Sequence, residues 1–351
     1  MAKQKVIDSH IHLWPPETSN EQGHTWMTPG NPLAKPHLLE HYLKASYQNE
    51  NDESDVEVEG VIYVETDVRY DDPRSGADVA TWAKGPLDEI SFLRSIVNGA
   101  YGERESKMLL GVVPWAPMDQ PPSVLREYLR LAEERAGEKC WKRVKGFRFL
   151  LQFFTDQESF EKLVLGDDFI GNLKELGNRN FSFDVGVDQR SGGSWQLELV
   201  AKAMEKAHEG VDEDKKIVSI VNHLCKPAFD EPGAAFERWC SAITAMSRLS
   251  KTYMKLSGAF SELPERLSNV QEIAGALGPW LMHLFENFGA KRIMFGSDWP
   301  VCNVQGPRGE DSWTVWKDIA MSWSADSRYA LSLDDVDWLW YETARGAYTT
   351  E

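Results

Sequence analysis

The chain has 351 residues, of which 42% are hydrophobic, and its formal net charge at pH 7 is −17. This length allows one large domain or two ordinary ones, and the apolar content is enough for a sizeable core. The negative charge disfavours nucleic acid or an anionic membrane as a partner, and no apolar run approaches the ~18 residues of a transmembrane helix.

The N-terminal residues and the cysteines give an expectation about the cellular compartment. The chain starts with Met-Ala-Lys-Gln-Lys and continues into an apolar strand, without the apolar stretch of a signal peptide. Its cysteines show no Cys-x-x-Cys spacing; they are Cys140, Cys225, Cys240 and Cys302. We therefore expect reduced thiols in a cytoplasmic protein, and the sequence leaves open whether it forms a homo-oligomer.

Apolar strand patterns alternate with amphipathic helical patterns along the whole chain. Strands are expected at 5–12, 58–65, 107–113, 144–151, 180–187, 216–223, 252–258 and 291–298. Helical patterns include Ser123–Ala136, Gln196–Ala207, Phe236–Leu249 and Pro279–Phe288, the last of which stops at Gly289. Eight such β-then-α units match the size of a single (β/α)₈ barrel domain that spans residues 1–351.

An open, doubly wound sheet is the alternative arrangement of the same elements. The barrel is favoured because polar residues follow six of the eight strands, whereas an open sheet gathers its ligand groups at one switch point. The segment from Pro15 to Asp55 is an insert rich in proline, histidine and asparagine, and we expect it to fold over the barrel mouth.

The most informative motif is the pair of histidines that ends the first strand. His10 and His12 are two residues apart, so both point to the same face and form half of a site for a divalent metal. The ordinary alternative is a pair of hydrogen-bonded core histidines. Asp298 ends the last strand, and it meets the two histidines if the sheet closes on itself.

Other strand ends contribute further charged or polar side chains. They are Glu65, Arg148, Asp184 with the following Arg190, and His223 with the following Lys226. Each has an ordinary explanation as a loop acid, a structural ion-pair partner or a helix cap. Together they predict one pocket ringed by cations and carboxylates. His24, His37 and His41 of the insert are interpreted as surface or packing residues.

Four stretches resemble the amidohydrolase superfamily: 8–12, 146–148, 222–227 and 295–302. They look most like its branch of sugar lactonases and pyrone-dicarboxylate lactonases. The stretches 113–118, 145–148, 183–189 and 253–258 are similar to fungal L-rhamnono-γ-lactonases. The resemblance extends from residue 6 to about 345. The chain departs from relatives at Phe149, where many have histidine, and at Asp184, where decarboxylases place a metal-binding histidine.

The resemblance implies hydrolysis of an aldonic acid lactone, L-rhamnono-γ-lactone in particular. His10, His12, Asp298 and Glu65 are then expected to hold a divalent metal, most simply Zn²⁺. Asp298 would serve as general base and later acid, with His223 and Arg148 stabilising the oxyanion. A metal-free route, in which Asp298 alone takes the proton, stays open.

The same hypothesis assigns substrate contacts to further residues. They are Glu65, Asp184, Arg190 and Lys226 for the hydroxyls or the acidic product, and Trp14 and Trp299 for an aromatic wall. The ordinary reading of these tryptophans is core packing.

Two rival functions remain. A metal-dependent decarboxylase of an aromatic or muconic acid is disfavoured by Asp184, since a metal-binding histidine is missing there. A non-catalytic sugar-binding barrel is disfavoured because His10, His12, His223 and Asp298 occur together.

Overall fold

The computed structural model describes residues 3–48, 53–231, 233–263, 267 and 269–350, and it contains all eight expected strands. They are β1 (Gln4–Ile11), β2 (Val56–Val64), β3 (Leu109–Val113), β4 (Gly146–Leu150), β5 (Ser182–Gly186), β6 (Val218–Val221), β7 (Thr252–Leu256) and β8 (Ile293–Phe295). Most are shorter than predicted, because residues at their ends belong to turns or helices. Residues 107 and 108 close the helix before β3, and His223 begins a 3₁₀ turn after β6.

Parallel pairing and backbone hydrogen bonds join the strands into a ring. The ladders run in chain order from β1 to β3 and from β4 to β8. At the seam between β3 and β4, the amide of Arg148 donates to the carbonyl of Pro114 at 2.9 Å. At the seam between β8 and β1, the backbone amide of Asp298 donates to the carbonyl of His10 at 2.9 Å. The backbone amide of His12 donates to the carbonyl of Trp299 at 2.8 Å. This arrangement is a barrel, so the open-sheet alternative is wrong.

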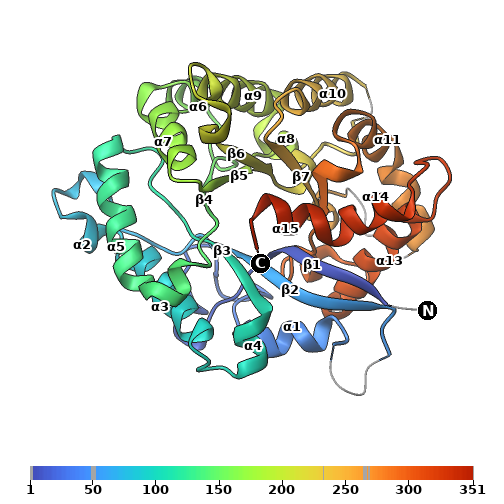
Figure 1. Ribbon diagram of the computed structural model, residues 1–351, viewed down its shortest axis with the longest axis horizontal. Coiled ribbons are helices and arrows are strands. Elements are labelled where there is room, and N and C mark those ends of the chain that lie inside the picture. Colours follow the sequence, from blue (N-terminus) through green and yellow to red (C-terminus); the bar gives the residue numbers. More distant parts are fainter. Residues whose placement is uncertain (1–2, 49–52, 232, 264–266, 268, 351) are drawn as a thin grey trace.

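Helices surround the strands, as Figure 1 shows. The longer ones are α3 (Lys84–Val97), α5 (Pro122–Trp141), α7 (Asp167–Asn178), α9 (Ser194–His208), α10 (Ala234–Ser247), α11 (Val270–Phe288) and α13 (Ser312–Ser324). The shorter ones are α1 (Leu39–Ala45), α2 (Val79–Trp82), α4 (Glu103–Met108), α6 (Gln157–Val164), α8 (Gln189–Gly192), α12 (Cys302–Gln305), α14 (Leu333–Asp337) and α15 (Thr343–Ala347).

Helix α11 begins nine residues earlier than predicted. Its N-cap is Asn269, whose side chain accepts hydrogen bonds from the amides of Gln271 and Glu272. Pro279 lies inside the helix, where it was expected to be the first residue. The predicted end is confirmed, because Gly289 adopts a positive φ of 66°.

The C-terminal segment closes the end of the barrel at which the strands begin. Ala344, Ala347 and Tyr348 pack against inward-facing residues such as Ile7 and Met294. Lys145, which precedes β4, donates to the carbonyl of Thr349 at 3.2 Å and marks this as the starting end of the strands.

The insert after β1 lies over the opposite end. Trp14 and His37 pair through two backbone hydrogen bonds of 2.9 and 3.0 Å, which fold the intervening segment back on itself. Trp26 and Leu33 from this segment line a cavity at the C-terminal ends of the strands. The predicted cover over the barrel mouth is therefore present.

The four cysteines are free, as expected from their spacing. Among the described residues, no helix combines the length and the apolar character needed to cross a membrane.

Candidate active site

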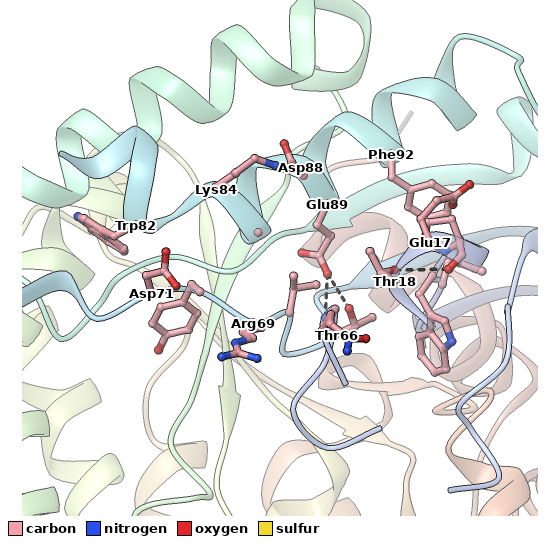
Figure 2. Close-up of a pocket in the computed structure, with 18 residues that line it drawn as sticks. Glu17, Thr18, Thr66, Arg69, Asp71, Trp82, Lys84, Asp88, Glu89 and Phe92 are labelled. Carbon is pink, nitrogen blue, oxygen red and sulfur yellow. Dashed lines mark hydrogen bonds and ion pairs between the residues drawn. The ribbon is translucent and has the colours of Figure 1, made fainter. Parts of the chain in front are cut away.

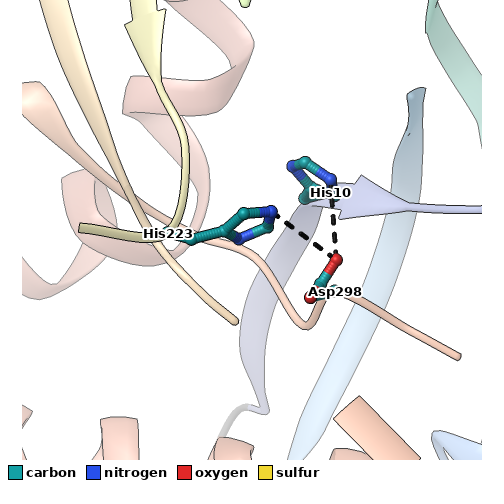
Figure 3. Close-up of side chains that lie close together, drawn as sticks. All are labelled: His10, His223 and Asp298. Carbon is teal, nitrogen blue, oxygen red and sulfur yellow. Dashed lines mark ion pairs between the residues drawn. The ribbon is translucent and has the colours of Figure 1, made fainter. Parts of the chain in front are cut away.

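Three strand ends bring His10, His12, His223 and Asp298 together. Oδ1 of Asp298 lies 3.6 Å from Nε2 of His10, 3.3 Å from Nε2 of His12 and 3.7 Å from Nε2 of His223. Figure 3 shows His10 and His223 directed at the Asp298 carboxylate. The proposition that the N-terminal histidines and the late aspartate are neighbours is thus confirmed, and the β8–β1 seam is its physical cause.

The backbone that presents these side chains is strained. His223, Leu224, Cys225 and Lys226 have positive φ angles of 54°, 55°, 62° and 45°, and Asp298 has 60°. Each such non-glycine residue costs about 1–2 kcal/mol, and backbone strain of this kind clusters at functional sites. The surrounding barrel therefore holds both strand ends in one conformation.

Hydrogen bonds on the outer ring nitrogens orient the histidines. Nδ1 of His12 lies 2.8 Å from the carbonyl oxygen of Val64, which only accepts, so Nδ1 carries a proton. Nδ1 of His223 contacts the Ser257 hydroxyl at 2.8 Å, and Nδ1 of His10 contacts Nζ of Lys255 at 3.2 Å. Each Nε2 is thereby left facing the shared centre.

The pKa shifts of Asp298, His223 and His10 favour an ionised carboxylate next to two neutral imidazoles. Burial would raise the pKa of Asp298, but His223, His12 and Lys226 hold that pKa below its ordinary value. Burial lowers the pKa of His223 to about 3 despite the nearby Asp298. Burial and the Lys255 charge keep the pKa of His10 well below its ordinary value. At neutral pH, Asp298 is therefore ionised between the neutral imidazoles of His10 and His223.

This donor set fits a divalent metal ion. One donor atom each from His10, His223 and Asp298 lies within 4.8 Å of the other two. Nitrogen and carboxylate donors in this number are typical ligands of zinc. Nε2 of His12 lies 3.2 Å from Nε2 of His10, so it faces the same point.

Glu65 was predicted as a further metal ligand, and the structure places its carboxylate against Arg148. Oε1 lies 2.6 Å from Nε of Arg148, and Oε2 accepts from the amide of Asp67 at 2.6 Å. Arg148 also donates to the carbonyl of Glu65 at 2.5 Å. Glu65 is outside the donor group described above, and its role as a ligand stays a prediction.

A cavity of about 210 Å³ opens beside the cluster. Six of the predicted site residues line it: His12, Trp14, Arg148, His223, Lys226 and Asp298. Residues without a predicted role line it too: Trp26, Leu33, Thr66, Asp67, Leu150, Gln152, Phe153 and Val301. Such a volume lies below the ~300–1,000 Å³ of sites for drug-sized ligands, so the cavity suits a small molecule.

Four residues with a predicted substrate role lie outside this lining: Glu65, described above, Asp184, Arg190 and Trp299. Asp184 is buried within the barrel, 2.6 Å from Nζ of Lys255. Arg190 is exposed, and its guanidinium donates to the carbonyl of Ser261 at 3.1 Å. The indole of Trp299 packs edge-on against Tyr42 at 5.6 Å between centroids, so it belongs to the core on this side.

Sequence reasoning missed Lys255 and Asp67. Lys255 lies on β7 and is fully buried, and burial lowers its pKa to about 8 despite its pairing with Asp184. The signal was available, since a lysine inside the apolar run 253–256 must find a buried partner. Asp67 follows Glu65 by two residues, and nothing in its local sequence distinguishes it from an ordinary loop acid.

A second cavity of about 570 Å³ adjoins the first and shares Trp14 and Thr66 with it. Figure 2 shows Glu89 of α3 reaching toward Thr66 at its centre. The His10–His223–Asp298 group is not part of its lining. The chemistry-bearing residues therefore belong to the smaller cavity.

Comparisons with known proteins match most of the chain to an amidohydrolase profile and to sugar lactonases. The family profile described as "Amidohydrolase" matches residues 7–349. The chain is 29% identical over 335 residues to an L-rhamnono-gamma-lactonase of Scheffersomyces stipitis, with 90% of each sequence covered. It is 29% identical over 280 residues to an L-fucono-1,5-lactonase of Burkholderia multivorans, covering 78% of this chain and 80% of the relative.

One solved structure resembles the barrel closely. It is an amidohydrolase of Burkholderia multivorans with bound zinc, which superposes with a TM-score of 0.70 at 25% identity and covers 99% of both chains. The likeness therefore involves the complete barrel rather than a single motif.

Proposed function

The chain belongs to the amidohydrolase family, and we propose that it is a lactonase that opens a sugar lactone by adding water to the lactone carbonyl. The observation that carries this proposal is an ionised carboxylate, Asp298, at the wall of a cavity of about 210 Å³, within 3.3–3.7 Å of three imidazole nitrogens. The two sugar-lactonase relatives support the same class of substrate.

We propose L-rhamnono-γ-lactone as the substrate. The relative with this name covers 90% of the chain, and the lining of the cavity suits a 6-deoxy sugar. Leu33, Leu150 and Val301 offer apolar contacts for a methyl carbon. Thr66, Gln152 and other polar residues offer hydrogen bonds for hydroxyls.

The side chains divide the chemical work as follows. Asp298 accepts a proton from water as the water oxygen bonds to the carbonyl carbon. Arg148 and Lys226 line the same cavity, and their positive charges favour the oxyanion that forms. When the bond between the carbonyl carbon and the ring oxygen breaks, Asp298 returns the proton to that oxygen.

We also propose that the cluster binds Zn²⁺ through His10, His12, His223 and Asp298. A bound zinc ion lowers the pKa of water to about 7 and polarises a carbonyl. Treatment with a chelator is expected to remove zinc, measured by mass spectrometry, and to lower the melting temperature, with both restored by added zinc. A chain that is active and stable without zinc would establish the metal-free route instead.

The test of function uses the purified chain and L-rhamnono-γ-lactone, with acid release followed by pH-stat titration. Asp298→Asn is expected to lower kcat by about 10²–10⁴-fold, the usual contribution of a general base. The control is Asp311→Asn, which changes an exposed aspartate just before α13. Equal rates for Asp298→Asn and wild type would refute the mechanism, and release of CO₂ from an aromatic acid would favour the decarboxylase.

A further inference from the structure

Asp67 is an acidic residue of the cavity that the mechanism above does not use. It lies in the loop that follows β2 and lines the same cavity as Asp298 and Arg148. Its amide is occupied by Oε2 of Glu65 at 2.6 Å. Its carboxylate forms no hydrogen bond or ion pair with any residue that the structure describes.

An unpartnered carboxyl group in such a place can bind a hydrogen-bond donor from outside the protein. Asp67 is partly buried, and burial together with the neighbouring Glu65 raises the pKa of its carboxyl group to about 7. Arg148, the cation whose charge acts on Asp67, already binds the Glu65 carboxylate through its Nε and donates to the Glu65 carbonyl. The Asp67 oxygens are therefore open to water or to a ligand in the cavity.

The loop also holds Asp67 in a fixed position. Its φ of 56° is in the left-handed region, which aspartate adopts more readily than most non-glycine residues and which sets the direction of the side chain. The preceding Thr66 is anchored on three sides. Its carbonyl accepts from the indole of Trp26 at 3.0 Å, its hydroxyl contacts His24 at 2.8 Å, and its amide donates to Glu89 at 3.1 Å.

We infer that Asp67 is a specificity-determining residue that accepts hydrogen bonds from hydroxyl groups of the lactone, away from the carbonyl that reacts. The inference rests on the proposed function and deepens it. Above pH 7 the carboxylate is ionised, so hydrogen bonds from hydroxyls to it are charge-assisted, and a fixed acceptor makes them selective. The preferred substrates are therefore polyhydroxylated lactones, and unsubstituted lactones gain nothing from Asp67.

The experiment compares two lactones and three variants. L-rhamnono-γ-lactone carries hydroxyls, and γ-butyrolactone has the same reacting group without them. The variants are Asp67→Ala, Asp67→Asn and the control Asp71→Asn, an exposed aspartate four residues further along the same loop. Asp67→Ala is expected to lower kcat/KM for the sugar lactone by about 10- to 100-fold, the usual effect of losing a charged hydrogen bond. Its kcat/KM for γ-butyrolactone should stay unchanged, and Asp71→Asn should match wild type on both.

An equal loss on both lactones would overturn the inference, because Asp67 would then act on the reacting atoms. An unchanged kcat/KM of Asp67→Ala on both lactones would overturn the inference as well. Equilibrium binding of L-rhamnitol, a neutral polyol without a carbonyl, gives a readout that needs no turnover. Weaker binding to Asp67→Ala than to wild type supports the inference, and equal or absent binding to both overturns it. If wild type opens neither lactone, the proposed function fails, while the polyol measurement still decides the role of Asp67.

Discussion

Glu89 illustrates how a single buried carboxyl group organises the loop beside the active site. Its Oε1 accepts from the Tyr63 hydroxyl at 2.6 Å, from the Thr66 hydroxyl at 2.8 Å and from the Thr66 amide at 3.1 Å. Its Oε2 is buried and has no partner among the described residues. Burial and the nearby Glu65 raise the pKa of Glu89 to about 7. The folded protein therefore keeps this group protonated at mildly acidic pH.

This shift predicts a pH-dependent change in stability. The pKa is about 7 in the folded state against 4.5 ordinarily, so the folded state binds the extra proton and loses stability as pH rises from 4.5 to 7. Glu89→Gln cannot ionise, so its stability relative to wild type should increase over this range, by up to about 3 kcal/mol. Urea unfolding at several pH values measures the difference, and Glu17→Gln, at an exposed position, is the control. A constant difference between pH 4.5 and 7 would contradict the expectation.

At the level of elements, two turns meet at His223. The turn after β6 presents His223 from a run of four left-handed residues, and the turn after β7 contains Gly258 with a φ of 64°. A Cβ atom added at Gly258 would overlap Nδ1 of His223. The neighbouring Ser257 holds that same nitrogen at 2.8 Å. Glycine at this position thus lets one turn support the side chain of the other.

Gly258→Ala is expected to displace His223 and to lower kcat/KM by at least tenfold, besides destabilising the fold. Gly210→Ala is a matched control, since Gly210 also has a positive φ, of 66°, but nothing lies within 4 Å of its added Cβ. Both variants carry the backbone penalty of about 1–2 kcal/mol, and only Gly258→Ala adds the collision. Steady-state kinetics and melting temperatures separate the two effects. Equal activity in both variants would show that the turn at Gly258 shifts to make room for the added Cβ and leaves His223 in place.

Across the whole molecule, the end of the chain is tied to the centre of the barrel. The hydroxyl of Tyr348, which follows α15, donates to both oxygens of Asp184 on β5 at 2.9 Å. Asp184 also pairs with Lys255 on β7, and all three side chains are buried. Lys255 in turn contacts His10. A network of polar groups thus links the C-terminal segment with the strands that form the active site.

Tyr348→Phe is expected to destabilise the fold by about 1–3 kcal/mol, because a buried carboxylate loses a donor. Tyr341→Phe is the control, since the Tyr341 hydroxyl forms no hydrogen bond with the described residues and the residue packs against the same apolar cluster. Urea unfolding at neutral pH gives both values. If Tyr348→Phe lowers the free energy of unfolding no more than Tyr341→Phe does, Lys255 alone satisfies the Asp184 carboxylate.

The sequence by itself determined the order and type of the elements. Strands buried on both faces need continuous apolar runs, and these runs marked all eight strands in chain order. The alternation of side chains placed His10 and His12 on one face, and the carboxyl ends of the strands predicted where polar residues gather. The strand ends and the start of α11 were less accurate, because caps such as Asn269 and turns such as the one at His223 depend on tertiary contacts.

Only the tertiary structure decided which polar side chains share the cavity. Arg148, Lys226 and Trp14 line it, whereas Asp184 pairs with Lys255 inside the barrel and Arg190 lies on the surface. Asp67 joins the cavity without any local signal. The physical reason is that the alternation of residues in a strand shows which side chains share a face of that strand, but not which side chains of other strands lie beside them. The register between strands, including the shifts in β1, and the closure of the ring decide which faces meet.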